Sequence, residues 1–374
     1  MRFIYITSVL LLALSACKKD KDQEQVISPT PSVCSADEYC FTRDGQNTVD
    51  FSGQTARLLQ LSEISTYLKS ANSGAQLDAD ILTEMFSNNE GAGSSYFSND
   101  AIAPGKQLKN KCFLANVSYY EDLFSEISAN SGTTNAAEEG QAGIITSTVD
   151  PSKKYLVDAN GFEYTQLIEK GLMGDVFYYQ ALNTYITNVE SGTLEMGVAA
   201  DAAAGKYYSE AEHAFDEAFG YFGVPVDFPT NTSPLYFYGK YCSSRDGALG
   251  TNDIMSDFIA ARKALVNSQI DATSIDNVRM HWQRVIAGTV INYLKQAKET
   301  EDMAVKCHVL SEAYAFIGNL LFNNSDYSWT PQMVSDARAM LGTSLYQTSD
   351  EMMDELILFV VENTELELVD VAFL

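Results

Sequence analysis

Basic residues are scarce in this chain of 374 residues: 24 Lys and Arg stand against 50 Asp and Glu, so the formal net charge is −26. A protein of this charge repels a phosphate backbone, and we therefore expect no nucleic acid partner. The chain has only three histidines, and no Cys-x-x-Cys pair supports a zinc ribbon or a thioredoxin-type site. Hydrophobic residues still make up 46% of the chain, which excludes wholesale disorder.

Motifs of hydrolytic sites are missing as well. The sequence contains neither an H-E-x-x-H helix nor a G-x-S-x-G turn, and it has no Gly-rich phosphate loop. The segment 245–253 mixes Asp and Gly but lacks the ligand spacing of an EF-hand, and we interpret it as a turn. We therefore predict no catalytic residues and a protein that is not an enzyme.

The most apolar run lies at the N-terminus, where residues 4–14 follow Arg2 and lead into Leu14-Ser15-Ala16-Cys17. The run is shorter than the roughly 20 residues that span a bilayer, and small residues before a cysteine are typical of a lipoprotein signal. We predict a signal peptide over 1–16, lipid on Cys17, and a tether over 17–40. The protein would then be anchored by lipid in the cell envelope, at the outer membrane, facing the periplasm or the surface. A short anchor that stays attached is the alternative.

Five cysteines remain after the signal peptide, and their wide spacing does not suggest a disulfide framework. Cys34 and Cys40 are close enough to form a small loop in an oxidising envelope. The sequence leaves that pairing open.

Helical periodicity dominates from Thr55 onward. Leu58, Leu61, Ile64 and Leu68 recur at three- and four-residue steps, which places them on one face of an amphipathic helix. Further helices are predicted over 78–86, 119–127, 162–189, 200–219, 252–269, 275–298, 301–322, 331–341 and 350–362. Strand signals are weak, and only 153–161 suggests one short strand.

These elements predict an all-α fold of two packed antiparallel helical bundles with long irregular loops. One loop, 87–106, is rich in Gly, Ser and Asn, and another, 222–251, is rich in aromatic residues and Pro. We expect the second loop to join two halves of a helical domain 41–374, at about 41–221 and 252–374.

Two histidines lie in matching contexts, H-A-F-D-E-A-F from His213 and H-V-L-S-E-A-Y from His308. Each has a glutamate four residues later, on the same helix face, so two such helices packed together would gather two His and two Glu. That set suits a transition metal such as iron or zinc. The predicted ligands are His213, Asp216, Glu217, His308 and Glu312, with Glu210 and Glu212 as supporting residues.

A second interpretation needs no metal. In a chain with 50 acidic residues a glutamate near a histidine is common, and the same side chains would form a buried hydrogen-bonded network. Glu210-x-x-His213 has the spacing of di-iron bundles, but Val305 stands at the equivalent place before His308, which disfavours a di-iron site. His281 has no carboxylate at helical spacing ahead of it, and we interpret it as a packed or surface residue.

Four segments carry a resemblance to a known family: VDFSGQTARL at 49–58, KGLMG at 170–174, EHAFDEAFGYFG at 212–223 and HVLSEA at 308–313. On them the chain resembles the uncharacterised bacterial lipoprotein family catalogued as domain of unknown function 4856, over most of residues 40–350. That family is similar to imelysins, envelope proteins of two helical bundles that are often associated with iron acquisition and carry a G-x-H-x-x-E motif. His213 aligns with the motif histidine, whereas Ala211 replaces its glycine and Asp216 its glutamate.

With the duplicated His/Glu pattern, this resemblance implies a lipid-anchored, imelysin-like envelope protein. It would be an accessory in iron or other metal-linked uptake, with an uptake partner at the outer membrane. Two other functions stay open, a structural or protein-interaction lipoprotein without metal and a degenerate metallohydrolase. The first predicts separately packed histidines and an exposed apolar patch. The second needs an open coordination position, a general base and a substrate-sized cleft.

Overall fold

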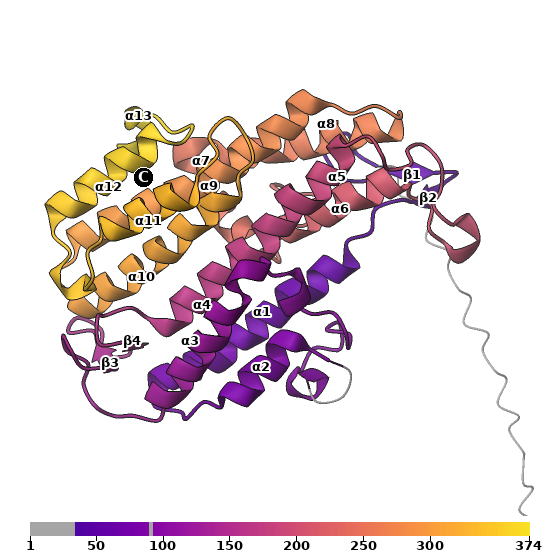
Figure 1. Cartoon of the computed structure of the whole chain (residues 1–374). Coiled ribbons are helices and arrows are strands. Elements are labelled where there is room, and N and C mark those ends of the chain that lie inside the picture. Colours follow the sequence, from indigo (N-terminus) through magenta and orange to yellow (C-terminus); the bar gives the residue numbers. More distant parts are fainter. Residues whose placement is uncertain (1–33, 90–92) are drawn as a thin grey trace, which may run out of the picture. The chain divides into compact units, whose positions relative to one another are not determined.

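Helices form most of the regular structure in a computed structural model of the chain, which describes residues 34–89 and 93–374 (Figure 1). Only two short hairpins accompany the helices in this part of the chain. The predicted all-α fold is therefore confirmed. The predicted signal peptide, Cys17 and most of the tether lie outside the described residues. Within them, every helix is too short or too polar to cross a membrane.

The first half of the described chain contains both hairpins and five α-helices. The strands are β1 (Thr42–Arg43), β2 (Gln46–Asn47), β3 (Gly143–Thr146) and β4 (Lys154–Val157). The helices are α1 (Ser52–Ser70), α2 (Ala79–Ser87), α3 (Val117–Asn130), α4 (Tyr164–Leu172) and α5 (Thr187–Glu190). The periodic leucines and isoleucine of α1 are all buried, as their spacing predicted.

The second half contains the helices α6 (Glu210–Phe222), α7 (Tyr238–Leu249), α8 (Ile254–Val266), α9 (Ala272–Glu299), α10 (Met303–Asn319), α11 (Pro331–Ala339), α12 (Asp350–Glu362) and α13 (Leu368–Val371). Helix α11 begins with Pro331 behind the cap Thr330, whose side chain accepts a hydrogen bond from the backbone of Met333. Helix α12 has the bounds that the sequence predicted.

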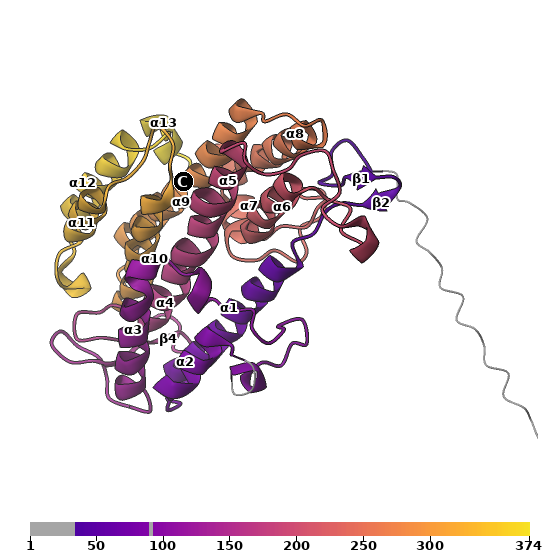
Figure 2. The ribbon, with the colours of Figure 1, turned by 45° about the vertical axis from the view of Figure 1, so that its right-hand side comes forward.

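Helix α9 packs against α7, α8, α10 and α12, and α10 in turn packs against α4 (Figure 2). At the centre, the buried ring of Trp282 on α9 meets Tyr178, Phe222 and Tyr238 at centroid distances of 5.2, 4.8 and 5.3 Å. These rings come from segments far apart in the sequence. Their burial therefore holds the two halves of the helical unit on one aromatic core.

The predicted long helix over 162–189 is continuous, but its middle is wound as π-helix in η5 (Met173–Tyr178) and η6 (Gln180–Ile186). Gly174 explains how closely α10 approaches this run. A Cβ on Gly174 would lie 1.9 Å from Oδ1 of Asn319, so only a glycine fits there. π-Helical winding is often found at functional sites, and Asp175 lies in η5.

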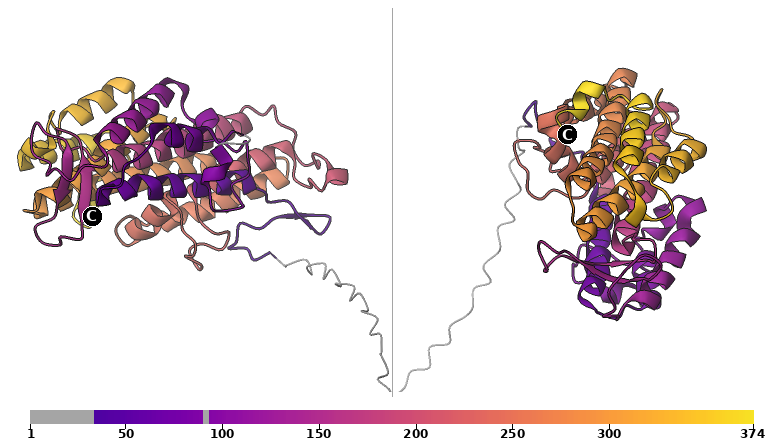
Figure 3. Two further views of the ribbon diagram at one scale, coloured as in Figure 1. Left: turned by 90° about the horizontal axis from the view of Figure 1, so that it is seen from below. Right: turned by 90° about the vertical axis from the view of Figure 1, so that its left-hand side faces the viewer.

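The two hairpins lie at opposite ends of the helices (Figures 1 and 3). Hairpin β1–β2 pairs Arg43 with Gln46 just before α1, and β3–β4 pairs Ile145 with Tyr155 after α3. Only β4 was expected. Strands of two to four residues are too short to show the period-two alternation by which a strand is recognised.

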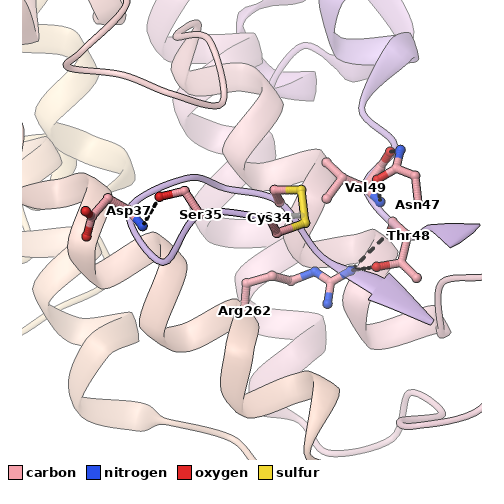
Figure 4. Close-up of a disulfide and its surroundings, with 8 residues drawn as sticks. Cys34, Ser35, Asp37, Asn47, Thr48, Val49 and Arg262 are labelled. Atoms are coloured by element: carbon pink, nitrogen blue, oxygen red, sulfur yellow. Dashed lines mark hydrogen bonds between the residues drawn. A yellow bond between two sulfur atoms is a disulfide. The ribbon is translucent and has the colours of Figure 1, made fainter. Parts of the chain in front are cut away.

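Cys34 and Cys40 form a disulfide, with their Cα atoms 5.3 Å apart, which answers the question that the sequence left open. Figure 4 shows the bond near Arg262 of α8, whose Nη2 donates to Thr48. Tyr39, beside Cys40, is buried with its ring stacked on Phe219 at 3.8 Å. The segment before α1 is thus fixed against α6 and α8.

Two predictions of local structure are wrong. The helix expected over 200–219 begins only at Glu210, because Ser209 forms a capping box with Glu212 and Gly205 ends a single turn before it. The segment 222–251, expected to be a loop, contains α7. Its three prolines all precede residue 238, so they break the chain before the helix and not within it.

Candidate functional site

His308 lies in a cluster of charged side chains from α10, α4 and the residue before α4. Its Nδ1 is 2.5 Å from Oε2 of Glu163, and its Nε2 is 3.5 Å from Oε2 of Glu312. The imidazole stacks on Tyr155 of β4, with centroids 4.3 Å apart and planes at 12°. Burial disfavours the charged ring, but Glu163 and Glu312 outweigh it and raise the pKa of His308. Both ring nitrogens therefore favour carrying a proton.

A line of alternating charges continues from Glu312. Its Oε1 lies 3.4 Å from Nζ of Lys170, which also pairs with Glu169, and Glu169 accepts from Lys69 at 2.8 Å. Burial disfavours the charges of Lys170 and Glu169. Even so, Glu169 and Glu312 raise the pKa of Lys170, and the two lysines lower that of Glu169. Each buried charge is thus held by a neighbour of opposite sign.

His213 has fewer polar contacts. Its ring stacks on Tyr208 with centroids 4.2 Å apart, as His308 stacks on Tyr155, but its buried Nδ1 has no hydrogen-bond partner in the described part of the chain. Glu217, one turn later, accepts from Nε2 of Gln54 at 2.8 Å. Of the two predicted His/Glu pairs, the structure therefore shows a direct contact in His308–Glu312.

The other predicted carboxylates on α6 pair with arginines. Asp216 accepts from Nε of Arg262 at 2.7 Å, and Glu212 accepts from both Nη atoms of Arg43 at 2.8 and 3.0 Å. Asp216, Glu212 and Arg262 are fully buried, so these ion pairs anchor the β1–β2 hairpin and α8 on α6. Glu210 is exposed and accepts a hydrogen bond from the backbone of Glu195 at 3.3 Å.

The predicted ligands thus form two groups. His308 and Glu312 lie beside the β3–β4 hairpin, and the residues on α6 lie beside β1–β2, at the other end of the helices (Figure 1). No hydrogen bond or ion pair joins the two groups within residues 34–89 and 93–374. In the same ranges no three His, Cys, Asp or Glu side chains are arranged to hold a metal ion. Metal binding by these residues stays a prediction.

The π-helical turn η5 places a buried carboxylate at a cavity. Oδ1 of Asp175 accepts from Nδ2 of Asn116 at 2.9 Å, and Oδ2 accepts from the hydroxyl of Tyr120. Burial raises the pKa of Asp175 to about 6 against these hydrogen bonds. Buried carboxyl groups with such raised pKa values are often found at functional sites.

This cavity, of about 290 Å³, lies between α3, α4, α10 and α11, and a neighbouring one of about 500 Å³ shares four of its lining residues. The shared residues are Tyr314, Pro331, Val334 and Arg338. We call the two cavities together the Arg338 groove. Tyr119, Leu167 and Phe162 add aromatic and apolar surface to its walls, so the groove combines an apolar lining with a few polar groups, as ligand sites usually do.

Arg338 is the one cationic side chain that lines this groove among the described residues. Its Nε donates to the backbone oxygen of Tyr314 at 3.0 Å, and its guanidinium lies 4.4 Å from the centroid of the Tyr314 ring. Throughout the described ranges it makes no ion pair with a carboxylate. Its two Nη atoms therefore remain available for a carboxylate group, which arginine binds in a fork geometry.

Sequence analysis missed the groove and missed Glu163 and Lys170 as partners of the His308 cluster. One signal was present in the KGLMG segment. Gly171 and Gly174 leave room for the side chains of Tyr120 and Asn319. Asp175 directly follows Gly174 in the sequence. Arg338 has no such local signal, because its role depends on the tertiary approach of α11 to α10.

Comparison with known proteins gives one result. A family model described as Domain of unknown function (DUF4856) matches residues 36–368, which is most of the chain. No curated protein and no solved structure matches.

Proposed function

The chain belongs to the DUF4856 family, and because that membership assigns no activity, we propose a function from the sequence and the groove: a lipid-anchored binding protein of the bacterial envelope. Its ligand is a small organic anion with an aromatic or apolar body, held in the Arg338 groove. The protein acts by binding and not by catalysis.

The observation that carries this proposal is the guanidinium of Arg338. It is fixed on Tyr314, it makes no ion pair among the described side chains although its charge acts on Asp175 in the same cavity, and it lines a groove with apolar walls. Arg338 is only partly buried, so its guanidinium can be reached by an anion that enters the groove. Asp175, Asn116 and Asn319 supply further polar atoms for orienting a ligand.

Calorimetric titration with benzoate tests the groove, because benzoate combines a carboxylate with an aromatic ring. We expect one binding site per chain, weakened at least tenfold in Arg338→Gln, since a charge-assisted hydrogen bond contributes about 1.5–3 kcal/mol and about 1.4 kcal/mol is a factor of ten. Arg284→Gln is the matched control: Arg284 pairs with Asp370 and lines none of the cavities described above. Equal affinity in both variants would refute the proposed role of Arg338.

The anchor rests on the lipobox at 14–17, and a Cys17→Ser variant tests it. We expect the wild type in the membrane fraction with a lipid mass on Cys17, and the variant without that mass. A wild-type protein released without lipid would contradict this part of the proposal.

A second candidate function is the metal-linked uptake that the sequence predicts. The observation in its favour is that His308 lies beside two carboxylates, Glu163 and Glu312, which are metal ligands of the expected kind, and a metal bound there would take the place of the proton on one ring nitrogen. Metal content by mass spectrometry, compared between the wild type, His308→Ala and His213→Ala, tests it. Stoichiometric iron or zinc that is lost in His308→Ala would support the proposal, and a metal-free wild type in metal-supplemented medium would refute it.

A further inference from the structure

The smaller cavity of the Arg338 groove, of about 290 Å³, is lined by charges of both signs. Among the described residues of its lining, Asp175 is the one acidic side chain and Arg338 the one basic side chain. No ion pair joins the two in the described ranges, although the charge of Arg338 acts on the Asp175 carboxyl. Opposite charges that share a cavity without contact are complementary to a ligand that carries both signs.

The carboxylate of Asp175 can accept more hydrogen bonds than it does. Asn116 and Tyr120 each donate one to it, whereas an ionised carboxylate offers about four lone-pair sites. Burial raises the pKa of Asp175 to about 6, so Arg338 and the two hydrogen bonds do not fully compensate its negative charge. Above about pH 7 the carboxyl is nevertheless ionised. A cationic group that reaches it in this cavity would therefore be stabilised.

Two amide side chains of the same lining have oxygens without a hydrogen-bond donor. Asn319 is 2% exposed, and its Nδ2 donates to the backbone oxygen of Lys170 and the hydroxyl of Tyr238, but no described residue donates to its Oδ1. Asn116 donates from Nδ2 to Asp175, and its Oδ1 likewise has no donor in the described ranges. Buried polar atoms are nearly always paired. An ammonium group, with three N–H donors and no acceptor, fits a lining of one carboxylate and two unpaired amide oxygens.

We propose that the ligand of the Arg338 groove is an amino acid with an aromatic or aliphatic side chain. Its carboxylate pairs with Arg338. Its ammonium group binds Asp175 and the amide oxygens of Asn116 and Asn319, and its side chain lies on the apolar wall that includes Leu167. This inference rests on the function proposed above, because the amino acid supplies the carboxylate of that proposal and adds a cation.

Calorimetric titration of the full-length protein in detergent micelles, at about pH 7.5, tests the inference with two matched pairs of ligands. The pairs are L-phenylalanine with 3-phenylpropionate and L-leucine with 4-methylpentanoate, and the two members of a pair differ only in the ammonium group. We expect the amino acid of at least one pair to bind about tenfold more tightly than its partner, as a charge-assisted hydrogen bond to a carboxylate would produce.

Asp175→Asn should abolish this preference. The amino acid should bind about tenfold more weakly than to the wild type, whereas the carboxylate without an ammonium group should bind no less tightly, since a negative charge has been removed from the cavity. Asp122→Asn is the matched control, because Asp122 is an exposed aspartate of α3 outside both cavities of the groove, and it should keep the preference. The two ligands of a pair are compared within one variant, so a change in stability does not mimic the effect.

Equal affinity of the two members in both pairs, or a preference that persists in Asp175→Asn, would overturn this inference. If benzoate and the two simple carboxylates still bound in a manner that depends on Arg338, the function proposed above would be unaffected by that result. Absence of binding by every one of these ligands would overturn both proposals together.

Discussion

The guanidinium of Arg338 lies 4.4 Å from the ring centroid of Tyr314, while its Nε donates to the backbone oxygen of the same residue. The two contacts hold the side chain on α10 and leave both Nη atoms to the groove. Stacking on an aromatic ring also fixes a long side chain in one conformation, which reduces the entropy lost when a ligand binds. The position of the guanidinium can therefore be tested by substituting the residue that lies behind it.

That residue is Gly318, where a Cβ would lie 2.2 Å from Nη2 of Arg338. In Gly318→Ala the flexible end of the arginine must move, whereas the backbone of α10 need not. We expect a nearly unchanged melting temperature and a benzoate affinity about fivefold lower, because a displaced fork loses part of its hydrogen bonding. Gly247→Ala, with open space around its Cβ, is the control and should bind benzoate like the wild type.

His308→Gln should remove a pH dependence of stability. The pKa of His308 is raised in the folded protein, so its pairing with Glu163 and Glu312 stabilises the fold fully below the ordinary histidine pKa of about 6.5. That stability is lost as pH rises through the folded-state pKa. Below about pH 6 the free energy of unfolding of the variant should be about 3 kcal/mol lower than that of the wild type, because the nearly fully buried Glu163 loses its partner. This difference should shrink at higher pH.

Urea unfolding of the wild type and the variant across this pH range measures the effect. His281 supplies a control of opposite sign, since burial lowers its pKa despite Asp257 nearby. The contribution of His281 to stability should therefore increase as pH rises to about 6.5, and this increase should be absent in His281→Gln. A constant gap between wild type and His308→Gln would mean that His308 is not the charged member of the cluster.

Asp175→Asn should change the pH dependence of stability between about pH 4 and pH 6, which is below the range in which His308 acts. Burial raises the pKa of Asp175 from 3.8 to about 6, so between these values the folded protein holds a proton that the unfolded chain has released. Stability therefore falls as pH rises through this window, by roughly 3 kcal/mol for a shift of about two units. The asparagine stays neutral, and the difference in unfolding free energy between variant and wild type should change across the window. Parallel stability curves would contradict the assignment.

Gly174→Ala should destabilise the fold by about 2 kcal/mol, as overpacking in a close-packed interior usually does. The added methyl would meet Oδ1, Cγ and Cβ of Asn319, a buried residue that donates to Lys170 and Tyr238. Because several atoms of one fixed side chain are in the way, α10 must shift. Chemical denaturation against Gly247→Ala measures the cost, and an unchanged midpoint would show that α10 is less tightly packed there.

Most of the helices could be predicted because their apolar residues repeat with a period near 3.6. The bounds of α12 were predicted to the residue, and Asp78, where the helix over 78–86 was expected to begin, is the cap of α2. Helix α7 was missed because its residues lack that periodicity and follow an unusual density of prolines. The π-helical winding of 173–186 has no signal in spacing alone, since it depends on how α10 packs beside Gly174.

The site was predictable only where it is local in sequence. The pairing of His308 with Glu312 follows from their spacing on one helix, but Glu163 reaches His308 from 145 residues away. On α6 the same spacing failed to predict the partners. Glu217 binds Gln54 and Asp216 binds Arg262, which come from other helices. The charged partners on a helix face are therefore set by tertiary packing, which a single sequence does not reveal.

A crystal structure of the protein with benzoate is the measurement that tests the proposed binding function most directly. We predict the carboxylate within hydrogen-bond distance of both Nη atoms of Arg338, with the phenyl ring between Tyr314 and the apolar wall of the groove. Benzoate bound away from the groove, or an empty groove at saturating benzoate, would contradict the account.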